Sequence, residues 1–219
     1  GEIHALVGEN GAGKSTMMRI LAGIYTGYEG DYLLNGKPVH LQSPRDALSR
    51  GIGMIHQELS VMPELSVAEN LFLGRQLTST LGFLDWRKMN QHAAQALRRL
   101  GIDIDVTRPL GNFSVAIQQM VAIARSLEFA AAKVLILDEP TSSLDLNETH
   151  QLFEVMRQLK AQGMGIIFIT HFLDQVYQVA DRITVLRNGK YVGTFESASL
   201  PRVNLIAKML GRSASDLEE

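Results

Sequence analysis

Short apolar segments alternate with longer helical segments along the chain. Four of the apolar segments have the length and the composition of buried strands: Ile3–Val7, Ile52–His56, Val134–Leu137 and Ile166–Thr170. Helical stretches separate them, and this alternation is typical of helices packed on a parallel sheet. We therefore predict an α/β domain with a mainly parallel core sheet.

Capping residues mark where three of the helices begin and end. Each begins at a residue whose side chain accepts a hydrogen bond from the first turn, and each ends at a glycine. The expected first and last residues are Ser43 and Gly51, Ser66 and Gly74, and Asp85 and Gly101. We expect one domain, residues 1–219, in which 1–63 and 131–219 form the core and 64–130 form a helical insertion.

Two Asn-Gly pairs lie between short strand-like runs. They are Asn35-Gly36 and Asn188-Gly189. Because both residues of this pair tolerate positive φ angles, the pair is the strongest short-range signal of a tight β hairpin. Some antiparallel structure is therefore predicted beside the parallel core.

Composition excludes several classes of protein. Of the 219 residues, 46% are hydrophobic, which is enough for a sizeable core, and the absence of cysteine excludes disulfides and thiol chemistry. The 21 basic and 23 acidic residues give a net charge of −2, so bulk charge gives no reason to expect a nucleic-acid partner. No apolar run approaches the roughly 18 residues that span a bilayer, so a membrane role is expected to come through partners.

A glycine-rich motif follows the first strand and precedes an apolar helix. Glycines there let backbone N–H groups turn toward phosphate oxygens, and the helix N-terminus adds its positive dipole end. Lys14 is expected to reach the β- and γ-phosphates, and Ser15 to bind Mg²⁺. The expected phosphate-binding residues are Gly8, Glu9, Asn10, Gly11, Ala12, Gly13, Lys14, Ser15 and Thr16.

Two adjacent carboxylates end the strand Val134–Leu137. We expect Asp138 to hold Mg²⁺ and Glu139 to act as a general base on the attacking water. Alone, this segment could equally be a strand that ends in a solvated acidic turn. The phosphate-binding motif earlier in the chain favours the catalytic interpretation, and the absence of an Asn-Lys-x-Asp motif disfavours a GTPase.

The segments "GENGAGKST", "HQE", "LILDEPTSSLD" and "THFLDQVYQVADRITVLRNG" together resemble the ATP-binding cassette of ABC transporters. The resemblance implies a P-loop NTPase fold with two further strands and an adenine-stacking aromatic upstream of Gly1. It implies that Gln57 meets Mg²⁺ and the attacking water. It also implies that Asp145 lies in a loop that crosses a dimer interface, and that His171 contacts the γ-phosphate.

The chain departs from this family at its signature, where a Leu-Ser-Gly-Gly-Gln run is expected. Here the run is Phe113–Ile117, followed by Gln118, and both glycines are replaced. The resemblance implies that Ser114 and Gln118 contact a nucleotide bound by the opposite cassette. Because Val115 and Ala116 add Cβ atoms where backbone should lie against phosphate, we expect a weakened grip rather than none.

Two longer segments, "GIGMIHQELSVMPELSVAENLFLGR" and "FSVAIQQMVAIAR", resemble the N-terminal cassette of bacterial monosaccharide importers, closest to the galactofuranose type. The resemblance implies ATP and Mg²⁺ as cofactors, a second cassette in the same polypeptide, membrane permease subunits and a periplasmic sugar-binding protein. It places the protein at the cytoplasmic face of the inner membrane.

Two alternatives remain open. One is a regulatory cassette that binds ATP without hydrolysing it, which the altered signature suggests. The other is a soluble ABC ATPase that acts on ribosomes or DNA, and the net charge of −2 counts against it.

Overall fold

The computed structural model describes residues 1–56, 61–80, 82–130, 132–213 and 215. A six-stranded sheet forms its centre, in the order β4-β5-β6-β1-β7-β8. Every neighbouring pair is parallel except β7 and β8. The predicted mainly parallel sheet is confirmed. The strands are β1 (Glu2–Val7), β4 (Ile52–Ile55), β5 (Val134–Asp138), β6 (Gly165–Ile169), β7 (Arg182–Arg187) and β8 (Lys190–Glu196).

Both Asn-Gly pairs form the predicted hairpin turns. Asn35 and Gly36, with φ angles of 53° and 73°, join β2 (Leu33–Leu34) to β3 (Lys37–Pro38). Asn188 and Gly189 have nearly the same angles, 50° and 73°, and join β7 to β8. The second hairpin therefore forms one edge of the main sheet, whereas the first forms a separate two-stranded sheet.

Eight α-helices and two 3₁₀ turns are found in the described part of the chain. They are α1 (Lys14–Leu21), α2 (Pro44–Ser49), α3 (Val67–Leu71), α4 (Trp86–Arg99), η1 (Leu110–Asn112), α5 (Val115–Ala130), α6 (Leu146–Ala161), α7 (Leu173–Val179), η2 (Ser197–Ser199) and α8 (Arg202–Leu210). Ser43, Ser66 and Asp85 each accept a hydrogen bond from the third residue of their helix, as predicted.

One helix end differs from the prediction. Helix α3 ends at Leu71, three residues before Gly74, because the chain leaves the helix at Phe72 and enters a further turn. In that turn the Arg75 N–H donates to the Phe72 carbonyl at 2.8 Å, and Gly74 takes a φ of +75°. Gly74 therefore ends the turn rather than the helix.

The two faces of the sheet pack against different helices. On one face, Leu6, Ile136 and Ile169 pack with Met18 of α1. On the other, Ile3, Leu135 and Phe168 belong to a larger cluster with α5 and α6, and Ala5, Val7 and Val185 pack with α7 and α8. Because successive strand residues point to opposite faces, this alternation follows from the apolar runs in the sequence. The result is a sheet between two helical layers.

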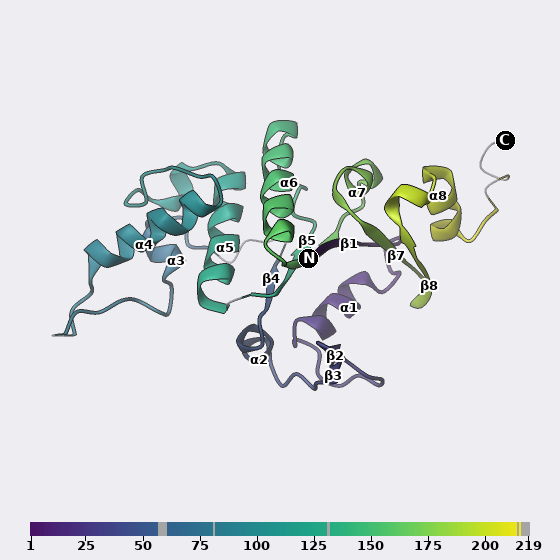
Figure 1. The fold of residues 1–219 in the computed structure, drawn as a ribbon, viewed down its shortest axis with the longest axis horizontal. Helices are drawn as coiled ribbons and strands as arrows, with labels where there is room; N and C mark the ends of the chain where they lie inside the picture. Colours follow the sequence, from purple (N-terminus) through teal and green to yellow (C-terminus); the bar gives the residue numbers. More distant parts are fainter. Residues whose placement is uncertain (57–60, 81, 131, 214, 216–219) are drawn as a thin grey trace.

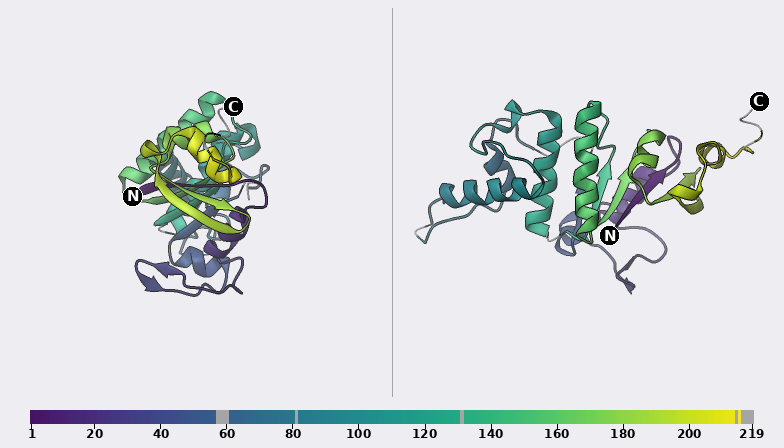
Figure 2. Two further views of the ribbon diagram at one scale, coloured as in Figure 1. Left: turned by 90° about the vertical axis from the view of Figure 1, so that its right-hand side faces the viewer. Right: turned by 45° about the horizontal axis from the view of Figure 1, so that its top comes forward.

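Helices α3, α4 and α5 gather at one end of the molecule, beyond β4, and α8 lies at the other end (Figures 1 and 2). Helix α4 buries Met89, Ala93 and Leu97, as its apolar periodicity predicts. The buried cluster that these helices form runs without a break into α6 and the sheet. The division at 64 and 130 into two subdomains stays a prediction. Within the described residues, no helix is both long and apolar enough to cross a membrane.

Candidate functional site

The loop between β1 and α1 has a backbone that only glycine adopts easily. Gly11 and Gly13 have φ angles of +82° and +104°, where an L side chain is strained. Gly8 is required for another reason, since a Cβ there would lie 2.4 Å from the Leu186 carbonyl oxygen. The loop is closed by a hydrogen bond from the Ala12 N–H to the Glu9 carbonyl at 3.0 Å. These features form the backbone cradle that the motif predicts.

Helix α1 begins directly at this loop with no side chain over its first turn. Its N-cap is Gly13, which makes no side-chain cap. The first N–H with a partner in the helix is that of Met17, which donates to the Gly13 carbonyl at 2.9 Å. The N–H groups of Lys14, Ser15 and Thr16 therefore remain available at the positive end of the helix dipole, where an anion is stabilised.

Lys14 lies across the loop. Its Nζ donates to the Gly8 carbonyl at 2.5 Å and to the Glu9 carbonyl at 3.0 Å. Burial lowers the pKa of the Lys14 ammonium, and the nearby charges of Glu139 and Asp138 oppose that shift. The ammonium therefore lies close to both the loop and the carboxylates.

The loop and the acidic pair share one hollow of about 230 Å³, which brings together segments that lie more than a hundred positions apart in the sequence. Its lining residues are Asn10, Gly11, Gly13, Lys14, Ser15, Thr16, Asp138, Glu139 and Ile169. Because β1 and β5 are parallel strands of one sheet, their C-terminal ends meet at the same edge. The predicted phosphate-binding and acidic residues are thus placed together by the topology.

Asp138 and Glu139 differ in environment. Burial and the neighbouring charge of Glu139 raise the pKa of Asp138, while His56 and Lys14 oppose the shift. Glu139 has a φ of +46°, which is rare for a residue with a side chain, and its N–H donates to the Ile169 carbonyl at 2.9 Å. That contact anchors the turn after β5 to the end of β6.

His171 follows β6 and meets Glu139 across the sheet edge. Its Nδ1 lies 3.3 Å from Glu139 Oε1. More than half of the His171 side chain is exposed, so both groups can be reached from the hollow. A carboxylate and an imidazole in contact at the mouth of a phosphate-sized hollow can orient a water molecule and accept its proton.

The residues around the hollow fit a magnesium ion. Mg²⁺ usually keeps several waters and binds one or two carboxylates together with substrate phosphates. The Ser15 hydroxyl and the Asp138 carboxylate both line the hollow, so they supply suitable oxygen ligands. No group of three or more acidic or histidine side chains that could hold a metal by itself occurs among the residues described. Gln57, the third predicted ligand, lies outside those residues.

Three further predicted nucleotide-binding residues do not line this hollow. Ser114 Oγ accepts from the Ile117 N–H at 3.4 Å at the start of α5, and Gln118 Nε2 donates to the Phe113 carbonyl at 3.1 Å. Asp145 caps α6 by accepting from the Glu148 N–H at 2.8 Å. All three make contacts at the start of their own helices, and their role toward a nucleotide on another cassette stays a prediction.

The expectation about the altered signature is wrong at one of its two positions. Val115 is 41% exposed, so its side chain lies on the surface of α5, as expected. Ala116 is only 1% exposed, because the next position on a helix is rotated by about 100° and here faces the core. Its Cβ therefore cannot lie against a phosphate outside the chain.

Gln175 links the two loops of the site, and sequence reasoning missed it. The Thr141 hydroxyl donates to Gln175 Oε1 at 2.5 Å, and the Thr170 hydroxyl lies 3.5 Å from the same oxygen. One amide oxygen thus connects the turn after Glu139 with the strand end before His171. A polar residue four positions after His171, in the first turn of the next helix, was the available signal.

The fold and this site define a class of protein, an ATP-binding cassette. The sequence matches the profile of the ABC transporter family over residues 1–142, and the chain belongs to that family. Among curated relatives, it is similar to the galactofuranose transporter ATP-binding protein YtfR of Escherichia coli (strain K12). The two are 50% identical over 212 residues, which is 97% of this chain and 42% of that protein.

A second relative comes from Burkholderia cenocepacia (strain HI2424) and is named for the import of ribose, galactose and methyl galactoside. It is 48% identical over 213 residues, which is 97% of this chain and 41% of that protein. The chain thus spans about two fifths of the length of the curated relatives it matches.

Solved structures with the same fold include a nucleotide-free ATP-binding cassette from an ABC transporter. Its TM-score is 0.77 at 26% identity, and the match covers 89% of this chain and 80% of that one. Another is cbiO1 from Clostridium perfringens, part of the transporter complex cbiONQ, with a TM-score of 0.76 at 26% identity. That match covers 100% of this chain and 88% of cbiO1.

Proposed function

We propose that this chain binds and hydrolyses ATP, and that it drives the import of a monosaccharide through separate membrane permease subunits. The observation that carries the proposal is the shared hollow, where Lys14 and the bare start of α1 face Asp138 and Glu139. A triphosphate fits the first pair of features, and a metal and an attacking water fit the second.

Each residue has a stated role in this proposal. The loop backbone and Lys14 bind the β- and γ-phosphates, and Ser15 and Asp138 hold Mg²⁺. When bound, Mg²⁺ neutralises charge on the phosphate oxygens. Glu139 accepts a proton from the attacking water, and His171, 3.3 Å from Glu139, orients it and contacts the γ-phosphate.

The proposal extends to partners. Both relatives are named as ATP-binding proteins of sugar import, one for galactofuranose and one for ribose and galactose. We infer a second cassette, which supplies a signature segment to the Lys14 site, together with permease subunits and a periplasmic sugar-binding protein. The cassette then works at the cytoplasmic face of the inner membrane.

The test of the chemistry is Glu139→Gln in the whole protein, with any second nucleotide site disabled. Loss of a positioned base lowers turnover by about 10²–10⁴-fold. Mg-ATP binding should persist, because the amide keeps the size of the side chain and the loop and Lys14 are untouched. Lys14→Ala is the contrasting variant, which should lose binding itself. Turnover that stays at the parent level in Glu139→Gln would contradict the assignment.

The sugar is tested separately. ATP turnover of the protein reconstituted with its permease and binding protein is measured with galactofuranose, galactose or ribose. We expect the strongest stimulation with galactofuranose, given the 50% identity to the galactofuranose relative. Equal or greater stimulation by ribose would contradict that preference while leaving the ATPase assignment intact.

A further inference from the structure

The β7–β8 hairpin packs directly on the phosphate-binding loop. The Gly189 N–H donates to the Ala12 carbonyl at 3.0 Å, and a Cβ built on Gly13 would lie 3.6 Å from the Gly189 Cα. Leu186, at the end of β7, closes over Gly8. The hairpin therefore forms a wall of the loop on the side away from the carboxylates.

The strand order decides which part of a nucleotide would meet this wall. Asp138 and Glu139 follow β5, two strands from β1 in one direction, and the hairpin lies in the other direction. A triphosphate on the loop with its γ-phosphate toward the carboxylates must extend its ribose and base away from them. That direction leads over the end of β1 toward β7 and β8.

A second hollow, of about 430 Å³, lies at the hairpin itself and is lined by Arg187, Asn188, Lys190, Tyr191 and Val192. Arg187 is already engaged, since its Nη1 donates to the Lys208 carbonyl at the end of α8 at 3.0 Å. Tyr191 is 67% exposed, which leaves its ring accessible.

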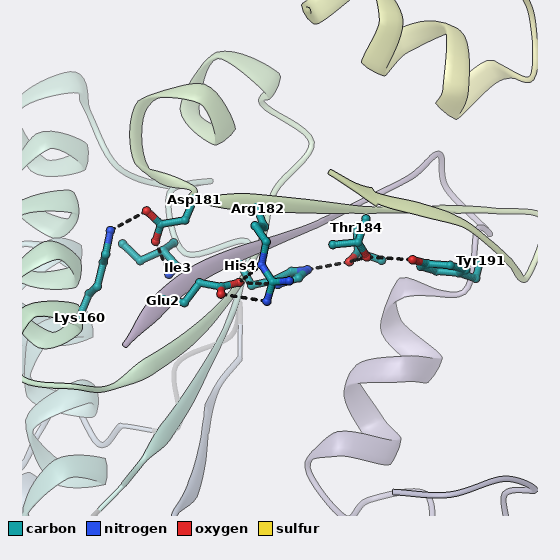
Figure 3. Close-up of polar contacts among 9 residues, drawn as sticks. Glu2, Ile3, His4, Lys160, Asp181, Arg182, Thr184 and Tyr191 are labelled. Carbon is teal, nitrogen blue, oxygen red and sulfur yellow. Dashed lines mark hydrogen bonds and ion pairs between the residues drawn. The ribbon is translucent and has the colours of Figure 1, made fainter. Parts of the chain in front are cut away.

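A row of hydrogen bonds holds Tyr191 in place despite this exposure (Figure 3). Its hydroxyl donates to Thr194 Oγ1 at 3.2 Å, and Thr194 contacts the Thr184 hydroxyl at 2.7 Å. Thr184 in turn lies 2.6 Å from His4 Nε2. His4 and Leu6 share one face of β1, and Leu6 packs with Met18 of α1. The row thus lies on the face of the sheet where the loop enters α1.

The row is anchored at its far end by ions. His4 Nδ1 is 2.8 Å from Glu2 Oε1, and Arg182 donates two hydrogen bonds of 2.9 Å to the Glu2 carboxylate. Partial burial works to raise the pKa of Glu2, but the hydrogen bonds from Arg182 and His4 hold it below its usual value. Glu2 therefore stays ionised at neutral pH, and the row is fixed at both ends.

We propose that Tyr191 is an aromatic contact for the nucleotide base, and that residues 187–192 form the base-side wall of the ATP site. An exposed ring tethered by its hydroxyl presents a face for stacking at little cost in side-chain freedom. Stacking tolerates any base, so this contact adds affinity without selecting adenine over guanine. The inference rests on the proposed function, because it assumes a triphosphate on the loop.

The test compares two ligands that differ only in the part that Tyr191 would touch. The dissociation constants of Mg-ATP and of inorganic tripolyphosphate with Mg²⁺ are measured for the whole protein and for Tyr191→Ala. The signal of this site is the part that Lys14→Ala removes. Tyr191→Ala should weaken Mg-ATP binding by about five- to tenfold, the lower end of base–aromatic stacking, and leave tripolyphosphate unchanged.

Two further variants separate stacking from structural damage. Tyr191→Phe keeps the ring and loses only the hydrogen bond to Thr194, so it should keep most of the affinity for Mg-ATP. Phe83→Ala removes a ring that is 73% exposed in the loop between α3 and α4, and it should change the binding of neither ligand.

The outcomes are distinct. Unchanged Mg-ATP affinity in Tyr191→Ala overturns the inference, and so does an equal loss for ATP and tripolyphosphate, which would mean that the hairpin only supports the loop. If Lys14→Ala alters the binding of neither ligand, the proposed function itself fails, and the inference falls with it.

Discussion

Helices α1 and α5 begin in contrasting ways, although each is predicted to point its N-terminus at a phosphate. Helix α1 follows a glycine backbone with no side-chain cap, so its first N–H groups are open. Helix α5 has the Ser114 hydroxyl over the Ile117 N–H, and the side chain of Val115 stands exposed beside it. Both helices carry the same dipole, but only α1 presents uncovered donors.

The difference teaches that the dipole alone does not make an anion site. Backbone N–H groups bind phosphate at short range, so a Cβ or a capping hydroxyl in front of them removes most of the benefit. The start of α1 is therefore built for a ligand of this chain. The start of α5 is stabilised by its own side chain, and its hold on another cassette's nucleotide should be weak.

The largest expected effect comes from closing the start of α1. Gly13→Ala places a Cβ on a residue with φ of +104°, which strains the backbone by about 1–3 kcal/mol and moves the loop. The nucleotide-dependent rise in melting temperature should disappear.

Gly163→Ala is the matched control for this change. Gly163 lies after α6 with a φ of +93° and has open space around it. It should show a similar loss of stability while keeping the shift with Mg-ATP. A Gly13→Ala protein that still responds to Mg-ATP would break the contrast between the two helices.

The next effect comes from opening the start of α5. Val115→Gly removes an exposed side chain and should tighten ATP binding, or speed hydrolysis, at the site of the partner cassette by a few fold. The loss of helix propensity costs about 1 kcal/mol. The measurement is single-site turnover in the whole protein, with the general base of each site removed in turn.

Ala116→Gly is the control, since its Cβ is buried. It should lower stability by a similar amount, about 1 kcal/mol, without any gain at the partner site. If both glycine variants raised activity equally, the orientation of α5 would not explain the difference.

The start of each helix could be predicted from the sequence only in part. The glycines around Lys14 announce the cradle, because no other residue type suits its φ angles. For α5, the sequence locates Ser114 as a cap and gives the apolar face of the helix, yet it does not show that residue 116 turns inward. The rotation of the first turn depends on how α5 packs against α3 and β4, which no local pattern records.

A smaller effect should follow removal of the cap itself. Ser114→Ala should destabilise the protein by about 0.5 kcal/mol, the low end for N-caps, because its 3.4 Å hydrogen bond is long and exposed. Ser66→Ala is the comparison, since Ser66 belongs to a two-way capping box with Glu69 and should lose about 1 kcal/mol. Midpoints of urea unfolding measure both. A larger loss for Ser114 would show that its cap matters more than its geometry indicates.

The smallest effect concerns the acidic side of the hollow and depends on pH. Folding raises the pKa of Asp138, so the carboxyl favours the folded state fully only below its unfolded pKa, near pH 4, and loses that contribution as the pH rises through the folded pKa. Asp138→Asn should match the parent near pH 4 and melt about 1–2 °C higher at pH 7 without added nucleotide. It should lose most of the further shift with Mg-ATP. A variant less stable than its parent at pH 7 would contradict this sign.

What lies around the two acidic residues shows the other limit of sequence reasoning. The strand Val134–Leu137 and the pair after it are plain from the apolar run and its ending. The contact of Gly189 with Ala12, and the oxygen of Gln175 shared between Thr141 and Thr170, join segments that are distant along the chain. They arise because several parallel strands end at one edge of the sheet, which a single sequence indicates only after the strand order is known.

The hold of Lys14 on its own loop has a calorimetric consequence. Its Nζ already has two acceptors, the carbonyl oxygens of Gly8 and Glu9. A phosphate that binds this ammonium exchanges acceptors instead of supplying the first ones, so the heat released per contact is small. The same exchange keeps the ammonium oriented at all times, so little conformational entropy is lost when the ligand arrives. Titration calorimetry should accordingly find nucleotide binding with a modest enthalpy, driven largely by the charge and water released from the triphosphate.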